Sequence, residues 1–163
     1  MTPAVTFYTF VLAGHIAAVV IAFGVTFAYP VMYAVGIKRE PRSMPGIHRI
    51  QDTVGKTVIT PFLALALLCG IYLASKLHAW SDFYVQWGLG AILVLGGLGG
   101  AFFAPHERRL AALADRDVGA SGEGEVTWSA EYTALRRRVG MVGYAANVLI
   151  LLTIYFMVAH TGA

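Results

Sequence analysis

Long apolar stretches separated by short polar ones dominate this chain. Four intervals contain no Asp, Glu, Lys or Arg, and they cover residues 1–37, 57–75, 83–106 and 139–163. A helix needs about 20 apolar residues to cross a bilayer, and each interval is about that long or longer. The pattern therefore predicts four membrane-spanning helices, at about 5–36, 56–76, 83–105 and 139–161.

These spans leave little sequence for a water-soluble core. Hydrophobic residues make up 58% of the chain and charged residues 13%, against roughly 45–50% and 25% in soluble domains. The first apolar run has no basic residues before it and is too long for a cleaved signal peptide, so we expect a retained span. The predicted fold class is all-α, with residues 1–163 forming one integral membrane four-helix bundle.

The basic residues predict the orientation of this bundle. Eleven of the 12 Lys and Arg residues lie in the connections after the first and third spans, and only Lys76 lies in the connection after the second. Basic connections stay in the cytoplasm, so we expect a multi-pass protein of the bacterial inner (plasma) membrane with both termini outside. Acidic residues are interleaved with the basic ones, so no clustered patch for a nucleic-acid partner is present.

The first cytoplasmic connection has a helical pattern. Ser43 and Pro45 are typical of a helix start. An apolar face follows opposite three polar residues: Ile47, Ile50 and Val54 against Arg49, Gln51 and Lys56. We expect a short amphipathic helix on the membrane surface that runs into the second span. There Thr60 would offer a hydroxyl near the carbonyl that Pro61 leaves unpaired.

The second cytoplasmic connection is expected to continue the third span as a helix through Leu110 and Leu113. The glycine-rich segment 119–124 is typical of a flexible loop tip. After it, Trp128 and Tyr132 are expected to lie along the membrane surface before the last span begins.

Small residues predict where helices approach one another closely. In the first span they recur every fourth position, at Gly14, Ala18 and Ala22. In the third span Gly96 and Gly100 are four residues apart, a spacing typical of tight helix packing within a bundle or between copies.

Two polar side chains lie at membrane depth. Asn147, in the last span, is expected to form an interhelical hydrogen bond. His15, in the first span, is an ionisable group in an apolar helix and so a candidate functional residue. One interpretation is structural, with His15 packed between helices and hydrogen-bonded to a group such as Gln86. The other is cofactor or proton chemistry, with His15 as an axial ligand of a b-type haem.

Other metal chemistry has little support in the sequence. It contains no HExxH motif, no paired cysteines and no cluster of carboxylates, which zinc hydrolases and di-iron proteins require. The single Cys69 cannot form an intramolecular disulfide. The five methionines do not cluster with the histidines as a copper site would need.

Several short segments resemble those of a known group of proteins. They are His48-Arg-Ile-Gln, Thr60-Pro61, Gly70-Ile-Tyr, Pro105-His-Glu-Arg-Arg-Leu and Glu131-Tyr-x-x-Leu135-Arg. Together they resemble the small four-span bacterial membrane proteins grouped as domain of unknown function 2269. This resemblance covers most of the chain and implies a topology of four spans, without implying an activity.

A more distant resemblance concerns the first span. The segment Gly14-His15-Ile16-Ala17-Ala18, followed by Gly24 and Pro30, is similar to the histidine-bearing first span of four-span protoporphyrinogen oxidase and copper-resistance D type membrane proteins. The oxidase family is expected to carry a lysine early in its third span, where this chain has Tyr84-Val-Gln86-Trp-Gly. The resemblance therefore transfers only His15, as a cofactor ligand.

These observations favour an integral membrane accessory or interaction protein over an enzyme. Its expected partners are the lipid bilayer and either further copies of itself or other subunits of a larger membrane assembly. The alternative is a haem-binding membrane redox protein that uses His15.

Overall fold

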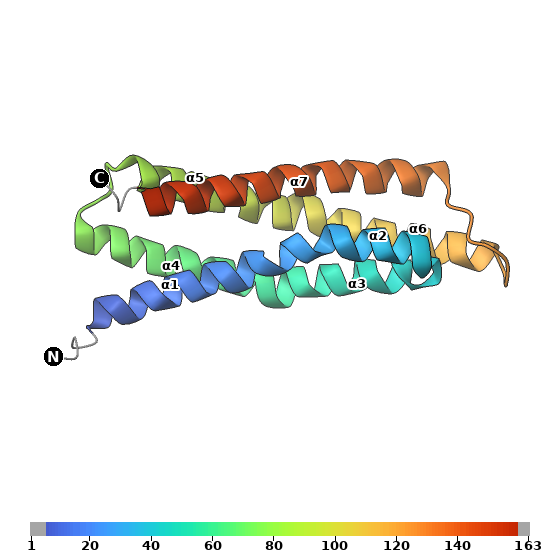
Figure 1. Cartoon of the computed structure of the whole chain (residues 1–163), viewed down its shortest axis with the longest axis horizontal. Helices are drawn as coiled ribbons and strands as arrows, with labels where there is room; N and C mark the ends of the chain where they lie inside the picture. Colours follow the sequence, from blue (N-terminus) through green and yellow to red (C-terminus); the bar gives the residue numbers. More distant parts are fainter. Residues whose placement is uncertain (1–5, 160–163) are drawn as a thin grey trace.

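The structure is a computed structural model that describes residues 6–159. Within these residues all regular structure is helical and no β-strand occurs. The chain runs back and forth in four long helical rods: Phe7–Arg39, Pro41–Leu77, Phe83–Ala120 and Ala130–Ala159. The rods lie side by side (Figure 1). The predicted all-α fold with four long apolar helices is confirmed.

Three of the four rods contain an irregular turn near the middle. The first consists of α1 (Phe7–Gly24), the 3-10 turn η1 (Val25–Ala28) and α2 (Tyr29–Arg39). The second consists of the 3-10 turn η2 (Pro41–Ser43), α3 (Met44–Val54), the π turn η3 (Gly55–Ile59) and α4 (Thr60–Leu77). The third consists of α5 (Phe83–Gly97), the π turn η4 (Leu98–Phe103) and α6 (Ala104–Ala120). The fourth is the single helix α7 (Ala130–Ala159).

A proline explains each irregular turn. Pro30, Pro61 and Pro105 are the second residues of α2, α4 and α6, directly after η1, η3 and η4. Proline lacks an N–H group and its ring clashes with the carbonyl four residues earlier, so the hydrogen-bond ladder changes register there. The Thr60 hydroxyl donates to the Gly55 carbonyl at 2.8 Å. This carbonyl also accepts the Thr60 backbone N–H, so it is not the carbonyl that Pro61 leaves unpaired, and the predicted partner of this hydroxyl was wrong.

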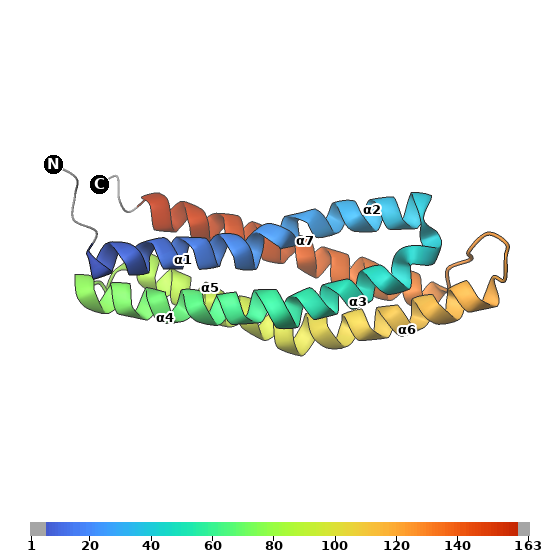
Figure 2. The same cartoon turned by 90° about the horizontal axis from the view of Figure 1, so that it is seen from below.

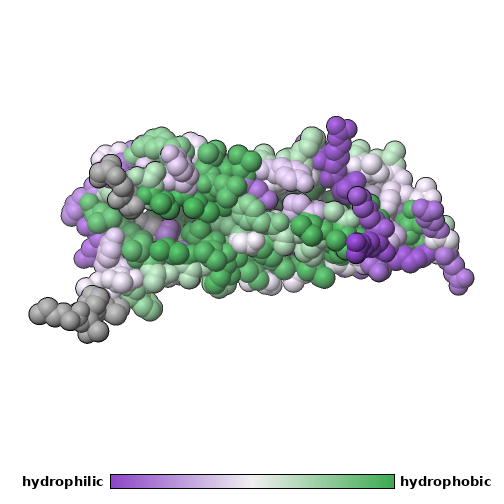
Figure 3. All heavy atoms as spheres, viewed as in Figure 1, coloured by the Kyte–Doolittle hydropathy of each residue, from purple (hydrophilic) through white to green (hydrophobic). Residues whose placement is uncertain are grey.

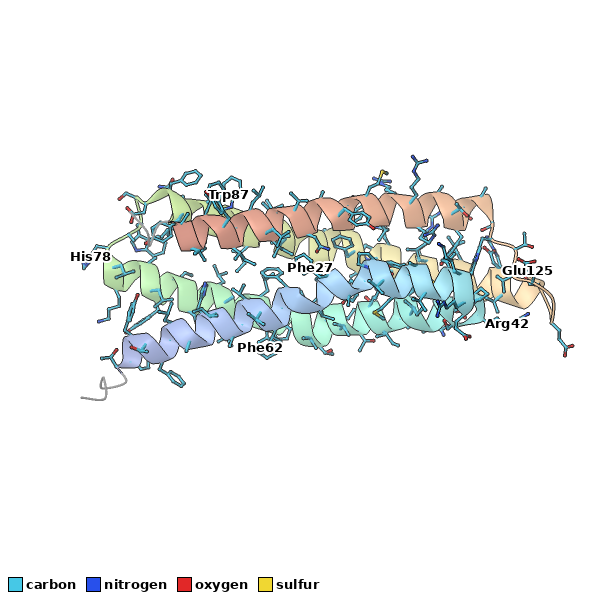
Figure 4. All side chains as sticks on the ribbon, viewed as in Figure 1. Phe27, Arg42, Phe62, His78, Trp87 and Glu125 are labelled. Atoms are coloured by element: carbon cyan, nitrogen blue, oxygen red, sulfur yellow. The ribbon has the colours of Figure 1, made fainter. Side chains whose placement is uncertain are left out.

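The two ends of the bundle differ in character. α1 begins and α7 ends at the same end as the connection 78–82 (Figures 1 and 2). His78 lies at that end, and Arg42 and Glu125 lie at the other (Figure 4). We call α2, α3, α6 and the first part of α7 the basic half. We call α1, α4, α5 and the rest of α7 the apolar half.

Hydrophobic side chains cover most of the visible surface of the apolar half, and hydrophilic ones gather toward the end of the basic half (Figure 3). Exposed large apolar residues include Phe10, Val20, Leu68, Leu93 and Val158. These residues belong to all four rods, so the apolar surface surrounds the bundle.

The two halves are also packed differently. In the apolar half α1 packs along α4, and α5 along α7. Its buried residues are mostly alanines, and Ala18 and Ala22 are fully or almost fully buried, as their spacing predicts. In the basic half α3 packs along α6, around a core of larger side chains: Met44, Leu110, Leu113, Ala114, Tyr132 and Val139.

The structure differs from the prediction of short helices on the membrane surface. α3 and α6 are continuations of the second and third rods, and they pack against each other inside the bundle. Tyr132, expected along the surface, is completely buried. The physical reason is that the apolar faces of these segments cover one another and not a membrane surface.

Candidate functional site

A group of polar side chains is buried in the core of the basic half. It consists of Tyr33 from α2, His48 and Gln51 from α3, Glu107 from α6 and Tyr132 from α7. We call these five residues the Glu107 cluster. Because they come from all four rods, the cluster forms only when the whole basic half is assembled.

The Glu107 carboxylate is the centre of the cluster. The Tyr33 hydroxyl lies 2.7 Å from Glu107 Oε1, and His48 Nδ1 lies 2.7 Å from Oε2. His48 Nε2 in turn lies 3.0 Å from the Tyr132 hydroxyl, and the Tyr33 hydroxyl lies 2.6 Å from Gln51 Oε1. The result is one continuous hydrogen-bond network that links Gln51, Tyr33, Glu107, His48 and Tyr132 in this order.

The cluster is shielded from solvent. His48 and Tyr132 are 0% exposed, Gln51 4% and Glu107 5%. Removing a carboxylate and an imidazole from water costs several kcal/mol for each charged group unless partners compensate. The hydrogen bonds to both oxygens of Glu107 and to both ring nitrogens of His48 provide that compensation.

A small cavity adjoins the cluster. Its volume is about 40 Å³, and Gln51 and Glu107 form part of its lining together with Asp52, Gly55 and Lys56. Two polar atoms at this cavity, Gln51 Nε2 and Asp52 Oδ1, are buried and form no hydrogen bond with a described residue. A cavity of this size with polar partners is suited to a water molecule.

The local sequence of α3 explains why His48 and Gln51 point inward. Met44, His48 and Gln51 follow one another at helical spacings of four and three, so they share one face, and all three are buried. The predicted face was wrong at two positions, since Ile50 is 54% exposed and Gln51 is buried. Ile47 packs against the core as predicted. Hydropathy alone misassigned this helix because Glu107 and Tyr33 supply hydrogen bonds for its polar residues.

A second buried carboxylate, Asp117, fixes the turn between α6 and α7. It accepts hydrogen bonds from the Ser129 backbone N–H at 2.9 Å and from the Ser129 hydroxyl at 2.7 Å. Arg116 also donates to it, at 3.0 Å. Burial by itself would raise the pKa of Asp117, but the hydrogen bonds from Ser129 and the charge of Arg116 outweigh this, and the pKa lies below its usual range. Its role in the structure is to join the start of α7 to the end of α6.

His15 lies alone between α1 and α4. Its Nδ1 is 2.8 Å from the carbonyl oxygen of Ala66. Its ring edge lies 3.3 Å from the position that a Cβ on Gly70 would occupy. The hydrogen-bond partner is therefore Ala66, and the predicted partnership with Gln86 was wrong, since the Gln86 amide donates to the Trp80 carbonyl. A ring nitrogen bonded in this way holds the first and second rods together.

The predicted packing residues divide into two groups. A Cβ on Gly96 would lie 3.3 Å from Leu63, whereas a Cβ on Gly100 would have no neighbour within 4 Å. Asn147 Oδ1 lies 2.9 Å from the Thr26 hydroxyl and so links α7 to η1. Gly96 and Asn147 thus take part in packing within the bundle, and Gly100 does not.

The remaining histidines are dispersed. His106 stacks on Phe102 and bonds to its carbonyl oxygen at 2.6 Å. His78 is exposed at the end of α4, and His160 lies outside the described residues. Among residues 6–159, no three His, Cys, Asp or Glu side chains are grouped so that they could hold a metal ion.

The sequence pointed to His15 and missed the Glu107 cluster. The sequence separations explain this, because His48 is 59 residues from Glu107 and 84 from Tyr132. One signal was available in the sequence. His48 and Gln51 lie on the face of α3 marked by Met44, where polar residues are expected to be buried only if they have partners.

In comparisons with known proteins, no family model, no curated protein and no solved structure matches the chain. The resemblance to the four-span families therefore stays a prediction.

Proposed function

We propose that this chain is an integral membrane protein whose apolar half spans the bilayer. The helices between the end of the apolar half and the irregular turns, α1, α4 and α5, have 18, 18 and 15 residues. Together with the turns they reach the about 20 residues that span the hydrocarbon core. Arg138, in α7, lies at a similar distance from that end. The basic half then extends beyond the bilayer on the cytoplasmic side of the inner membrane, and both termini face outside, in line with the positive-inside rule.

Cysteine labelling tests this orientation. In a Cys69-free background, a cysteine at Ser81 should react with a membrane-impermeant reagent added to intact cells, and a cysteine at Gly122 should not. Labelling of both positions from outside would overturn the proposed topology.

Within the membrane, the proposed role is that of an accessory or interaction protein, which either associates with itself or is a subunit of a larger assembly. The observation that carries this proposal is on α5 and η4. Gly90, Gly97 and Gly100 are exposed on the third rod, and a Cβ on any of them would have no neighbour within 4 Å. These glycines are not used for packing within the chain, and small residues allow a second helix to approach closely in lipid.

A matched pair of substitutions tests the proposal. Gly100→Leu should leave the fold intact, because the site is open, but reduce the size of the complex measured by native mass spectrometry from lipid nanodiscs. Gly96→Leu should instead destabilise the chain through its contact with Leu63. The proposed role would be overturned if the wild-type protein is monomeric and no other membrane protein is recovered with it after cross-linking and mild extraction.

A second candidate function, a haem-binding redox protein, is favoured by one observation at His15. With Nδ1 bonded to Ala66, the other ring nitrogen, Nε2, forms no hydrogen bond with a described residue. A neutral imidazole fixed in this way is typical of a metal ligand. Among the other described histidines, His48 is bonded to Glu107 and Tyr132, His106 is bonded to Phe102, and His78 lies at the end of α4. His15 would therefore be the single histidine ligand of a b-type haem, whose iron would supply the redox chemistry.

Absorption spectroscopy separates the two candidates. The proposed accessory protein, purified in detergent from cells supplied with haem precursor, shows no Soret band. A Soret band in the wild type that disappears in a folded His15→Gln variant would establish the second candidate instead.

A further inference from the structure

With the side chains in this orientation, the hydrogen-bond donors and acceptors of the Glu107 cluster do not match. The Tyr33 hydroxyl has one proton but lies within hydrogen-bond distance of both Glu107 Oε1 and Gln51 Oε1. The Gln51 Nε2 group carries two protons but has no hydrogen-bond partner among the described residues. Gln51 is 4% exposed and Glu107 5%, and unmatched donors and acceptors at such buried positions cost free energy.

Two arrangements of protons resolve the mismatch. In one, Glu107 is ionised and accepts from Tyr33, and the Gln51 amide is turned over so that its Nε2 donates to Tyr33. In the other, Glu107 is protonated and donates to Tyr33, Tyr33 donates to the Gln51 carbonyl oxygen, and Nε2 points into the cavity. The second arrangement has one proton more than the first and the opposite orientation of the Gln51 amide, so the same side chains accommodate Glu107 in both protonation states.

The charge of the cluster favours an added proton. An ionised Glu107 beside a neutral His48 would place one net negative charge in the core, and the hydrogen bonds to its oxygens offset the cost of burying that charge only in part. A proton on either His48 or Glu107 makes the cluster neutral. The two groups are 2.7 Å apart, so the proton can lie on either partner without leaving the hydrogen bond.

The 40 Å³ cavity gives this proton a route to solvent. Glu107 lines the cavity directly, and so does Asp52, which pairs with the exposed Lys56. Gln51 Nε2 and Asp52 Oδ1 supply the polar partners that a bound water requires. A carboxylate oxygen accepts two hydrogen bonds, so Glu107 also has a free position for this water.

We propose that the Glu107 cluster is a proton-binding site, which exchanges one proton with the aqueous phase at the basic end through water held in the cavity. On uptake, a hydronium ion in the cavity transfers a proton to the Glu107 carboxylate and becomes water. Glu107 keeps this proton when His48 Nδ1–H already donates to it, and passes it on when His48 is the tautomer whose Nδ1 carries no proton. The proton comes from the aqueous phase, so the cluster gains one proton and no other bond changes.

The surrounding charged and titratable groups come from every packed element. Tyr29 lies near Glu107 on α2, and Asp52 and Lys56 lie across the cavity. Arg108 follows Glu107 on α6 and is 3.9 Å from Asp52, and Arg136 lies near Tyr132 on α7. The Lys56 and Arg108 side chains are exposed, so the titratable groups in direct contact with Glu107 are His48 and Tyr33.

The first test measures where the proton is. The full chain, labelled with ¹⁵N-histidine and ¹³C-glutamate, is placed in lipid nanodiscs at neutral pH and its solid-state NMR spectrum is assigned with His48→Gln and Glu107→Gln. We expect either a His48 ring with both nitrogens protonated or a protonated Glu107 carboxyl. In Glu107→Gln, His48 should be neutral. A neutral His48 ring beside an ionised Glu107 in the wild type would overturn the proposal.

The second test measures the route. Gly55 lines the cavity and Gly46 lies on the same rod away from it, and a Cβ on either has no neighbour within 4 Å. Gly55→Leu should fill the cavity and slow exchange of the His48 ring proton with water by about tenfold or more, because the bound water is displaced. The matched Gly46→Leu variant should exchange at the wild-type rate. Equal exchange in both variants would show that the cavity is not the route.

Discussion

The two halves of this bundle bury different kinds of residue. In the basic half the largest fully buried side chains are Tyr132, Met44, Leu110 and His48. In the apolar half the most completely buried residues are Ala18, Ala22 and Ala66. In lipid, helices gain little by hiding apolar surface from one another, so they associate through close contact of small residues.

The basic half is stabilised by different interactions because it extends beyond the proposed hydrocarbon region. There, large side chains gain free energy by leaving water, and buried polar groups are held by specific hydrogen bonds. One chain thus uses two packing mechanisms, and substitutions should affect the two halves by different amounts.

The largest effect is expected in the Glu107 cluster. His48→Leu leaves Glu107 without its basic partner and should lower the free energy of unfolding by about 3–5 kcal/mol, the usual cost of breaking a buried pair. Reversible unfolding in mixed micelles, followed by circular dichroism, measures this loss. As a control, Ile50→Leu changes an exposed residue on the same helix and should be nearly neutral. A loss below about 1 kcal/mol for His48→Leu would mean that the cluster does not stabilise the basic half.

The next effect is expected at the turn between α6 and α7. Asp117→Asn should cost about 1.5–3 kcal/mol at neutral pH, the usual value of hydrogen bonds to a charged group. Because the pKa of Asp117 is lowered by folding, its contribution is present above its unfolded pKa of about 3.9 and is lost as the pH falls through the lower folded value. Thermal melts between neutral and acidic pH should therefore converge for wild type and variant at the acid end. Parallel curves would contradict this.

In the apolar half, the expected losses of stability come from steric overlap and not from charge. Gly96→Leu must displace Leu63 and should destabilise the bundle by about 1–3 kcal/mol, the typical cost of overpacking. The measurement is the melting temperature in detergent, with Gly97→Leu, which faces open space, as its matched control. Equal melting temperatures for the two variants would show that this helix contact does not contribute to stability.

The smallest effect is expected at His15. His15→Gln keeps a hydrogen-bonding group of similar length facing the Ala66 carbonyl and should cost only about 1 kcal/mol, the net value of one hydrogen bond. His15→Leu, which removes the donor, should cost more. If glutamine and leucine have the same effect in an unfolding titration, the bond between His15 and Ala66 is not what holds α1 against α4.

The rods of this fold could be predicted from the sequence because long apolar helices are encoded locally. In the apolar half, each rod is marked by a long interval without Asp, Glu, Lys or Arg. The turns beside Pro61 and Pro105 follow from the covalent structure of proline. Ala18 and Ala22 could be placed at a helix contact because their spacing alone puts them on one face.

The Glu107 cluster could not be predicted in the same way. The pattern of α3 suggested that Ile50 faces inward and Gln51 outward, and the structure reverses both. Burial of Gln51 is favourable only when Tyr33 lies beside it, and burial of His48 only when Glu107 and Tyr132 do. Those partners come from other rods, so the signal for this site is in the tertiary structure.

The three irregular turns also determine how the bundle can bend. η1, η3 and η4 lie at about the same distance from the end of the apolar half, so three rods have a compliant joint at one level. Within the described residues, α7 is the one rod whose helical ladder crosses that level without a change of register. Its stiffness therefore limits tilting of one half against the other. Gly140 and Gly143 lie in α7 close to this level, with no neighbour within 4 Å of a Cβ, and glycine is the residue that holds a helix least firmly. A tilt of the basic half would bend α7 at these two glycines.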